Sequence, residues 1–368
     1  MGAAILDRIT VRRFAIPLTV PYRLAFGVLE RFDTLVVECE ARDGRTGLGE
    51  ATVLTGYTDE TIEDSWRAAC DLAREMAGLD AESARRRIAP QVADRPFTAT
   101  AFGTALEMLE QSAALEIERA VVVPILGLLG SSGEEAMGLE IEALLGAGYR
   151  TLKIKVGADL DKDIAHVRTV QRLLRGRARI RIDANQGYGA EEGVAFVRAL
   201  DPEGVELFEQ PCAAGDWDAH LAVARASRVP MMLDESIYGM ADIERAAELA
   251  AARYVKLKLM KLGTLRALAQ ALERVRALGM TPVLGNGVAC DLGCWMEACV
   301  AARHIDNAGE MNGFLKTRAQ LLSEPLEMRD AAIRLKPGFA PRLALERLAP
   351  YTIATHDESG RSYRVRRA

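Results

Sequence analysis

The feature that most constrains this chain is an even succession of charged residues, each at the polar end of a short apolar run. Five of them lie 28, 26, 25 and 24 residues apart, at Lys155, Asp183, Glu209, Asp234 and Lys258. One strand, one helix and their two loops take about this length in a (β/α) barrel of ~250 residues. Because the C-terminal ends of all strands open on one face of such a barrel, the five side chains are predicted to converge there.

Eight apolar runs are candidates for the strands of this barrel, and eight strands close a ring. They alternate with amphipathic stretches of about 10–15 residues, which is the pattern of parallel βα units. The runs are 121–126, 152–156, 180–183, 205–208, 231–233, 254–259, 282–284 and 308–311. If the charged residues point inward, the outward neighbours are Ile154, Ile182, Phe208, Leu233 and Leu257. All five are apolar, as faces that pack against helices require.

The first 118 residues follow a different pattern, which predicts an α+β domain. Apolar and polar residues alternate over 9–16 and 35–40, as in antiparallel strands, and Asp43-Gly44 marks a hairpin turn. Helical periodicity then covers 59–77, 81–91 and 101–118. A chain of 368 residues has room for more than one core, since single cores stop growing near ~250–300 residues. We predict an N-terminal domain at 1–118, the barrel at 119–325, and a segment at 326–368 that packs back on the N-terminal domain.

Composition and charge narrow the classes of partner. Hydrophobic residues make up 49% of the chain, charged residues 27%, and the net charge is −5, so a nucleic-acid partner is not expected. The longest nearly apolar stretch, 120–130, contains Pro124 and is shorter than the ~20 residues of a membrane helix. Asp7 and Arg8 interrupt any signal-like apolar region, and a cytoplasmic location is expected.

The three acidic residues of the series predict a metal site. Carboxylates from Asp183, Glu209 and Asp234 suit a hard cation, Mg²⁺ first and Mn²⁺ as the alternative ion. No histidine or cysteine stands at a predicted strand end, which argues against zinc and copper. Three carboxylates without a cation would repel one another and raise each other's pKa. The competing interpretation is a set of structural salt bridges with the neighbouring lysines.

The two lysines of the series predict a pair of opposed bases. Lys155 ends the second candidate strand and Lys258 the sixth, so in a ring of eight they face each other across the mouth. Removing a proton α to a metal-bound carboxylate gives an enediolate, which the cation stabilises. Nearby positive charge also lowers the pKa of a lysine toward the working pH. Which lysine is the base and which the acid stays open.

The residues around these positions resemble the enolase superfamily, in its muconate lactonizing enzyme subgroup (the mandelate racemase/muconate lactonizing enzyme family). The matching segments are Lys153-Ile-Lys155, Asp183-Ala-Asn185, Phe208-Glu209-Gln210-Pro211, Leu233-Asp234-Glu235-Ser236 and Lys258-Leu-Met-Lys261-Leu-Gly263. The resemblance implies an α/β fold, a modified (β/α)₇β TIM-like barrel with an N-terminal α+β capping domain completed by the C-terminal segment. It also implies Mg²⁺ on Asp183, Glu209 and Asp234, acid and base roles for Lys155 and Lys258, and a role for Lys153 in holding the substrate carboxylate or tuning Lys155.

Three departures from the family pattern bear on specificity. Lys256 stands where relatives often carry a small polar residue such as Asn, and we interpret it as part of a structural ion pair rather than a catalytic group. The strand near Val283 is not followed by the histidine of the mandelate racemase subgroup. Glu310-Met311-Asn312 lacks the Asp-x-Asp with which dipeptide epimerases hold the substrate's amino group, and Glu310 resembles the glutamate of cycloisomerases.

Substrate-binding residues are expected on capping loops 19–29 and 52–58 and at the barrel mouth. Packing of the cap on the barrel would explain the loop aromatics equally well. The candidates are Tyr22, Arg23, Phe26, Tyr57, Asn185, Asn286 and Glu310. The glycine-rich turn 285–287, before a helix that begins near Asp291, could bind an anionic group through free N–H donors, or could be only a tight turn.

The resemblance and the residues together predict a metal-dependent isomerase acting on a small-molecule carboxylate, as a homo-oligomer. A racemase or epimerase of an amino acid derivative or related carboxylate is preferred, with a muconate-type cycloisomerase or a dehydratase (a lyase) as alternatives. Two other classes stay open: an inactive relative that serves as a scaffold, and an aldolase that forms a Schiff base on Lys155 or Lys258.

Overall fold

The N-terminal part of the chain forms three strands of a four-stranded antiparallel sheet covered by helices, and the fourth strand comes from residues 352–359. The computed structural model describes residues 4–24, 27–286 and 288–360. Strands β1 (Leu6–Leu24), β2 (Gly27–Ala41), β3 (Thr46–Thr52) and β14 (Thr352–Ser359) lie in the order β14-β1-β2-β3. The helices are α1 (Ile62–Met76), α2 (Ala81–Ile88), α3 (Gln91–Asp94) and α4 (Pro96–Leu109). The predicted bounds of the helix over 101–118 are both wrong, since α4 begins at Pro96 and ends at Leu109.

The close contact between β3 and α4 depends on two glycines. A Cβ added to Gly49 would lie 1.9 Å from the carbonyl oxygen of Ala101, and one added to Gly47 would lie 2.1 Å from that of Ala105. Neither backbone oxygen can move without breaking the helix. The glycines therefore allow α4 to lie directly on the sheet, with nearly every residue of the helix buried.

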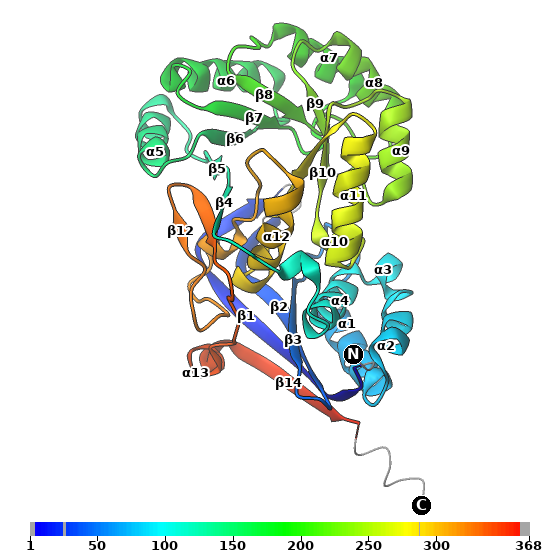
Figure 1. The fold of residues 1–368 in the computed structure, drawn as a ribbon. Coiled ribbons are helices and arrows are strands. Elements are labelled where there is room, and N and C mark those ends of the chain that lie inside the picture. The colour runs from blue at the N-terminus through cyan, green and yellow to red at the C-terminus, as the bar shows by residue number, and fades with distance from the viewer. Residues whose placement is uncertain (1–3, 25–26, 287, 361–368) are drawn as a thin grey trace, which may run out of the picture.

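The second part is a curled sheet of seven parallel strands with helices on its outside (Figure 1). The strands are β5 (Gly127–Leu128), β6 (Thr151–Lys155), β7 (Arg179–Asp183), β8 (Val205–Glu209), β9 (Met231–Leu233), β10 (Tyr254–Leu257) and β11 (Thr281–Leu284). The helices are α5 (Glu134–Gly146), α6 (Leu160–Leu174), α7 (Ala190–Ala199), α8 (Trp217–Ala226), α9 (Met240–Glu248), α10 (Leu259–Leu262), α11 (Leu265–Ala277) and α12 (Asp291–His304). The fold is therefore the predicted α/β barrel.

The ring closes without a regular eighth strand. Gly309, in the predicted run 308–311, donates to Pro124 O at 3.0 Å and accepts from Leu126 N at 2.9 Å. On the other side, Glu310 N donates to Leu284 O at the end of β11, at 3.0 Å. One bridge thus takes the place of the eighth strand, and it carries Glu310 to the carboxyl end of the barrel.

The predicted first strand, 121–126, is wrong for most of its length. Its residues form β4 (Val121–Pro124), which pairs antiparallel with β13 (Ala332–Leu335) rather than with a barrel strand. Val122 is 53% exposed, which is typical of an antiparallel edge with one face in water. The barrel strand in this region is β5, which pairs with β6. An apolar run alone does not distinguish these two environments.

The C-terminal part of the chain joins both sheets. It contains η2 (Gly313–Lys316), β12 (Met328–Arg329), β13, α13 (Leu345–Leu348), η3 (Ala349–Tyr351) and β14. β14 runs antiparallel to β1, with Arg8 opposite Ser359, while β13 pairs with β4 near the barrel. The domain boundaries at 118 and 325 stay predictions. Across the described residues, none of the helices combines the length and the apolar character that crossing a membrane requires.

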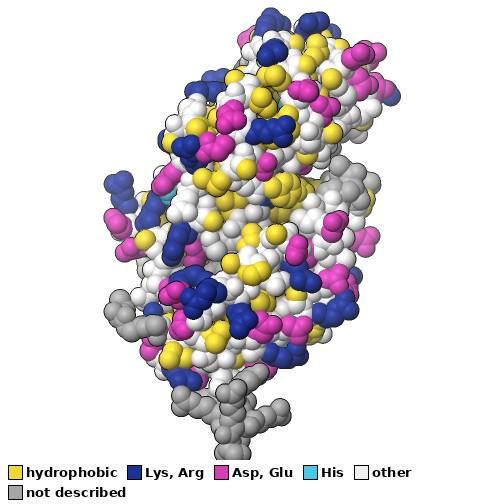
Figure 2. Space-filling model, turned by 90° about the vertical axis from the view of Figure 1, so that its right-hand side faces the viewer, with side chains coloured by type: hydrophobic (Ala, Val, Ile, Leu, Met, Phe, Trp, Pro, Cys, Tyr) yellow, Lys and Arg dark blue, Asp and Glu magenta, His cyan; other side chains and the backbone are white. Residues whose placement is uncertain are grey.

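Two buried carboxylates of the N-terminal part fasten it to the barrel. Glu50 on β3 accepts from Cys290 N and from Gly293 N at 2.6 Å each, at the start of α12. Glu107 on α4 accepts from Leu265 N at 2.6 Å at the start of α11. Carboxylates are favourable at helix N-termini, where backbone N–H groups lack partners. Viewed from the side, hydrophobic side chains gather at mid-height of the molecule (Figure 2).

Candidate active site

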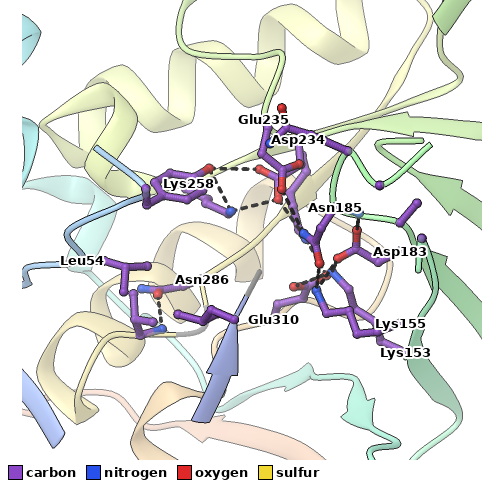
Figure 3. A pocket seen from close by; sticks show the side chains of 18 of the residues that line it. Leu54, Lys153, Lys155, Asp183, Asn185, Asp234, Glu235, Lys258, Asn286 and Glu310 are labelled. Carbon is purple, nitrogen blue, oxygen red and sulfur yellow. Dashed lines mark hydrogen bonds and ion pairs between the residues drawn. The ribbon is translucent and has the colours of Figure 1, made fainter. Parts of the chain in front are cut away.

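A cavity of about 780 Å³ lies over the carboxyl ends of the barrel strands. Its floor includes the predicted residues Lys153, Lys155, Asp183, Asp234 and Lys258. The N-terminal part covers it with Tyr22, Leu24, Leu54, Gly56 and Tyr57. The predicted convergence of distant residues on one barrel face is thus present, and Figure 3 shows their side chains pointing toward one another.

The three acidic residues stand on neighbouring strands. Asp183 ends β7, Glu209 ends β8, and Asp234 directly follows β9; the sheet register places Asp183 opposite Glu209. Their side chains are 0 to 3% exposed. The backbone N–H of Asp234 donates to Gln210 Oε1 at 2.9 Å, which fixes the loop after β9. We call these three residues the acidic row.

Ammonium groups of two buried lysines lie between the members of the acidic row. Lys153 Nζ is 2.7 Å from both Asp183 Oδ2 and Glu209 Oε2. Lys256 Nζ is 2.5 Å from Glu209 Oε1 and 3.4 Å from Asp234 Oδ2. Positive and negative groups therefore alternate along the row. The ion pair expected for Lys256 is present, with Glu209 as one partner.

Lys155 and Lys258 occupy the two ends of the acidic row. Lys155 Nζ lies 2.7 Å from Asp183 Oδ2 and contacts the side-chain oxygen of Asn185. Lys258 Nζ lies 2.8 Å from Asp234 Oδ2. Figure 3 shows the two pairs on different sides of the group of side chains. Lys155 is 51% exposed and Lys258 18%, so both reach the cavity from opposite ends of the row.

Burial and charge act in opposite directions on the pKa values of these groups. Burial alone would raise the pKa of Asp234, but Lys258 and its neighbouring lysines hold it well below the ordinary value. Burial alone would also raise the pKa of Asp183, but the attraction of Lys153 and its neighbouring lysines holds it below the ordinary value. Burial and the Asp183 carboxylate raise the pKa of Glu209 to about 7. Burial alone would lower the pKa of Lys258, but Asp234 raises it above the ordinary value.

The acidic row fits a hard divalent ion in the chemistry of its donors. It offers three buried carboxylates on adjacent strands, next to a cavity that a carboxylate substrate can enter. Within the described ranges, however, no three His, Cys, Asp or Glu side chains lie close enough to hold one ion together. The reason is that Lys153 and Lys256 separate the carboxylates. An ion entering here would replace some of these ammonium contacts.

The predicted substrate-binding residues fall into three groups. Tyr22, Tyr57, Asn185, Asn286 and Glu310 line the cavity. Glu310 does so with its carboxylate 2.8 Å from Lys256 and 3.2 Å from Lys153. Phe26 lies outside the described residues. Arg23 is part of β1, but its side chain is also outside the description.

The turn 285–287 was expected either to bind an anionic group or to be only a tight turn, and its first N–H, that of Gly285, donates to Leu257 O at 2.9 Å. The backbone N–H groups of Val288 and Ala289 donate to Asn286 Oδ1, at 2.9 and 3.1 Å. Those of Cys290 and Gly293 are taken by Glu50. Gly287 lies outside the described residues. These donors are therefore already paired within the protein and do not await an anion.

Sequence reasoning missed two groups at the site. Lys261 is buried and donates to Asp234 O at 2.6 Å and to Ile237 O at 2.8 Å, so it holds the loop that carries Asp234. Glu235 lines the cavity and accepts from the Asn185 amide at 2.9 Å. Both residues stand inside the segments that carried the family resemblance. Their position in those segments was the signal that could have identified them as site residues. Their contacts, however, depend on the fold.

Curated proteins and solved structures are similar to this chain over most of its length. Residues 136–343 match the family described as "Enolase C-terminal domain-like". An L-Lys-D/L-Arg epimerase of Methylococcus capsulatus is 32% identical over 330 residues, which is 83% of this chain and 90% of that protein. The muconate lactonizing enzyme of Pseudomonas fluorescens, solved with muconolactone, has a TM-score of 0.85 at 25% identity and covers 95% of this chain and 100% of its own. A dipeptide epimerase of Cytophaga hutchinsonii, solved with Mg and D-Ala-L-Val, has a TM-score of 0.85 at 19% identity, covering 96% of this chain and 99% of its own, which indicates a shared fold.

Proposed function

This chain belongs to the enolase superfamily, in the muconate lactonizing enzyme subgroup, and from that premise we propose that it removes and returns a proton α to a carboxylate as a metal-dependent racemase or epimerase. The substrate class proposed is an amino acid derivative, which the name of the M. capsulatus relative supports. The observation that carries the proposal is the placement of Lys155 and Lys258 at opposite ends of the acidic row, both at the wall of one cavity. Two opposed bases permit inversion at the α-carbon.

The proposal gives roles to eight residues of the site. Asp183, Glu209 and Asp234 hold Mg²⁺, or Mn²⁺ in its place. When bound, the ion supplies positive charge that stabilises the negative charge developing on the substrate carboxylate and lowers the pKa of the nearby lysines. Lys155 and Lys258 exchange the α-proton on the two faces of the substrate. Tyr22, Leu24 and Leu54 from the N-terminal part cover the reacting atoms.

A cycloisomerase is the second candidate because of residues 310 to 312. Glu310 is paired with Lys153 and Lys256, and Asn312 is a neutral amide that accepts from Lys316 at 2.8 Å. Residues 310 to 312 contain one acid only, so they do not offer a pair of acids to a substrate ammonium group. The muconate lactonizing enzyme among the structural relatives is consistent with that alternative. A dehydratase would share the first step. The homo-oligomeric state and the cytoplasmic location stay predictions.

The proposal is tested by deuterium uptake at the α-carbon. The chain is incubated in D₂O with a panel of N-acylated amino acids, dipeptides, acid sugars and muconates, with and without EDTA. Exchange is expected with at least one class of compound, is expected to stop in EDTA, and is expected to return with Mg²⁺ or Mn²⁺. Activity that survives EDTA, together with inactivation by borohydride in the presence of a carbonyl substrate, would instead identify a Schiff-base aldolase.

Tyr57 provides a more local prediction. Its hydroxyl accepts from Lys258 Nζ at 3.0 Å, and its ring centroid lies 4.4 Å from the same nitrogen. Tyr57→Phe keeps the ring and removes the hydroxyl, so Lys258 loses one partner that orients it. A hydrogen bond to a charged group is worth ~1.5–3 kcal/mol, and proton exchange on the Lys258 face is expected to slow by about tenfold or more.

The matched control for this variant is Tyr238→Phe. Tyr238 stacks near Tyr57 at a centroid distance of 6.4 Å, but its hydroxyl donates to the backbone oxygen of Tyr57. It is expected to have a much smaller effect on exchange. Equal rates for the two variants on both substrate antipodes would show that the hydroxyl of Tyr57 does not orient Lys258.

A further inference from the structure

Lys256 places a nearly buried positive charge at the floor of the cavity, which it helps to line. Its side chain is 2% exposed, and its ammonium group contacts three carboxylates. The contacts are Glu209 at 2.5 Å, Glu310 at 2.8 Å and Asp234 at 3.4 Å. Two of these three residues belong to the acidic row. The ammonium group of Lys256 therefore lies between Glu209 and Asp234, where an ion bound by both carboxylates would lie.

The fold leaves space for this side chain at one glycine. A Cβ added to Gly285 would lie 2.5 Å from Cε and 2.9 Å from Cδ of Lys256. The backbone at Gly285 is fixed, because its N–H donates to Leu257 O at 2.9 Å at the end of β10. Any larger residue at position 285 would push the Lys256 stem out of its present place. The position of the ammonium group thus depends on two neighbouring strands.

The lysines leave no net negative charge in the acidic row and Glu310. These four carboxylates contact five ammonium groups, those of Lys153, Lys155, Lys256, Lys258 and Lys261. Buried charges are tolerated when they are paired, and here each carboxylate has at least one partner. A divalent ion would then enter a neutralised group of side chains rather than an anionic one. Its binding must offset the loss of contacts that the lysines make.

We propose that Lys256 is a built-in counter-cation, which keeps the carboxylates paired when no ion is bound and weakens their affinity for divalent ions. The inference rests on the proposed function, because it takes the acidic row as the ion site. Because the affinity is weakened, the occupancy of the ion site follows the concentration of free Mg²⁺, and traces of the ion do not fill the site. In this proposal Lys256 acts through the ligands.

Calorimetric titration of the full chain with Mn²⁺, without substrate, measures this affinity directly. Lys256→Asn removes the charge and keeps a polar group, and a unit charge a few ångströms from a divalent ion is worth at least about tenfold in affinity. We expect its dissociation constant to be at least tenfold lower than that of the parent chain. Gly285→Ala displaces the ammonium group without removing it, so it is also expected to bind Mn²⁺ more tightly.

Glu310→Gln is expected to act in the opposite direction. Without the Glu310 carboxylate, Lys256 is left with Glu209 and Asp234 alone, and Mn²⁺ binding is expected to weaken. Lys261→Met is the matched control, because Lys261 is also buried and contacts Asp234 at 3.2 Å, but pairs with no other carboxylate among the described residues. It is expected to raise the affinity by less than either Lys256→Asn or Gly285→Ala.

The outcomes separate this inference from the proposed function. The parent chain, Lys256→Asn and Gly285→Ala could all bind Mn²⁺ tightly and with equal affinity. That result would overturn the role of Lys256 and leave the metal site intact. Absence of Mn²⁺ binding in the parent chain and in every variant would overturn both. If Lys256→Asn does not fold without metal, Gly285→Ala and Glu310→Gln still decide the matter, because their expected shifts have opposite signs.

Discussion

Replacing Lys155 by methionine is expected to slow the interconversion of the two antipodes of the substrate strongly while leaving α-proton exchange with one of them. Lys258 remains at the other end of the acidic row, 2.8 Å from Asp234, and still serves its own face of the α-carbon. Lys258→Met is expected to give the mirror result. A positioned acid or base contributes ~10²–10⁴-fold, so the racemisation rate should fall by about that factor in each variant. Proton NMR in D₂O, started separately from each antipode, measures both rates.

The control for these variants is a lysine outside the cavity. Lys162 on α6 is 84% exposed and pairs with Asp159 at 2.8 Å. Lys162→Met therefore makes the same lysine-to-methionine change at the protein surface. Its exchange rates are expected to equal those of the parent chain. If Lys155→Met and Lys258→Met each lost exchange with both antipodes equally, a two-base mechanism would be excluded. Unchanged racemisation in either variant would remove that lysine from the chemistry.

The inward and outward phases of the barrel strands could be predicted from sequence because they depend on period-two alternation. Leu207 and Met232, one layer below the charged residues, form a small core cluster with Val283 inside the ring. Ile182 and Phe208 belong instead to a cluster that includes helix residues outside it. The strand ends are marked by the charged residue that closes each apolar run. Convergence of the charged residues on one face was therefore predictable before any contact was known.

Contacts between distant segments could not be predicted in the same way. Glu50 occupies the N–H groups at the start of α12, yet it precedes Cys290 by 240 residues. The pairing of β4 with β13 likewise joins segments that sequence periodicity treats separately. Lys256 was recognised as an unusual residue, but its position among Glu209, Glu310 and Asp234 depends on the space at Gly285. Such features depend on packing across the fold, which local patterns do not contain.

Glu209→Gln is expected to cause the largest loss of stability of any conservative change at the site. The side chain is fully buried and accepts from Lys153 at 2.7 Å and from Lys256 at 2.5 Å. Glutamine has nearly the same shape but no charge, so two buried ammonium groups would each lose a partner. Breaking a buried ion pair from one side costs about 3–5 kcal/mol, and the free energy of unfolding in metal-free buffer is expected to fall by that amount. Urea unfolding followed by circular dichroism measures the change.

The reason for this cost can be tested by combining variants. Glu134 pairs with Arg172 on the protein surface at 2.6 Å, and Glu134→Gln is expected to leave the urea midpoint nearly unchanged. Glu209→Gln in a Lys256→Asn background should cost less than in the parent chain, because only Lys153 then loses its partner. Equal costs in both backgrounds would mean that Glu209 and Lys256 do not stabilise each other. An isolated buried charge is unfavourable whether or not the original ion pair was stabilising. The loss of stability in the single variant therefore does not measure the strength of the pair. The comparison of Glu209→Gln in the two backgrounds does, because it isolates the interaction between Glu209 and Lys256.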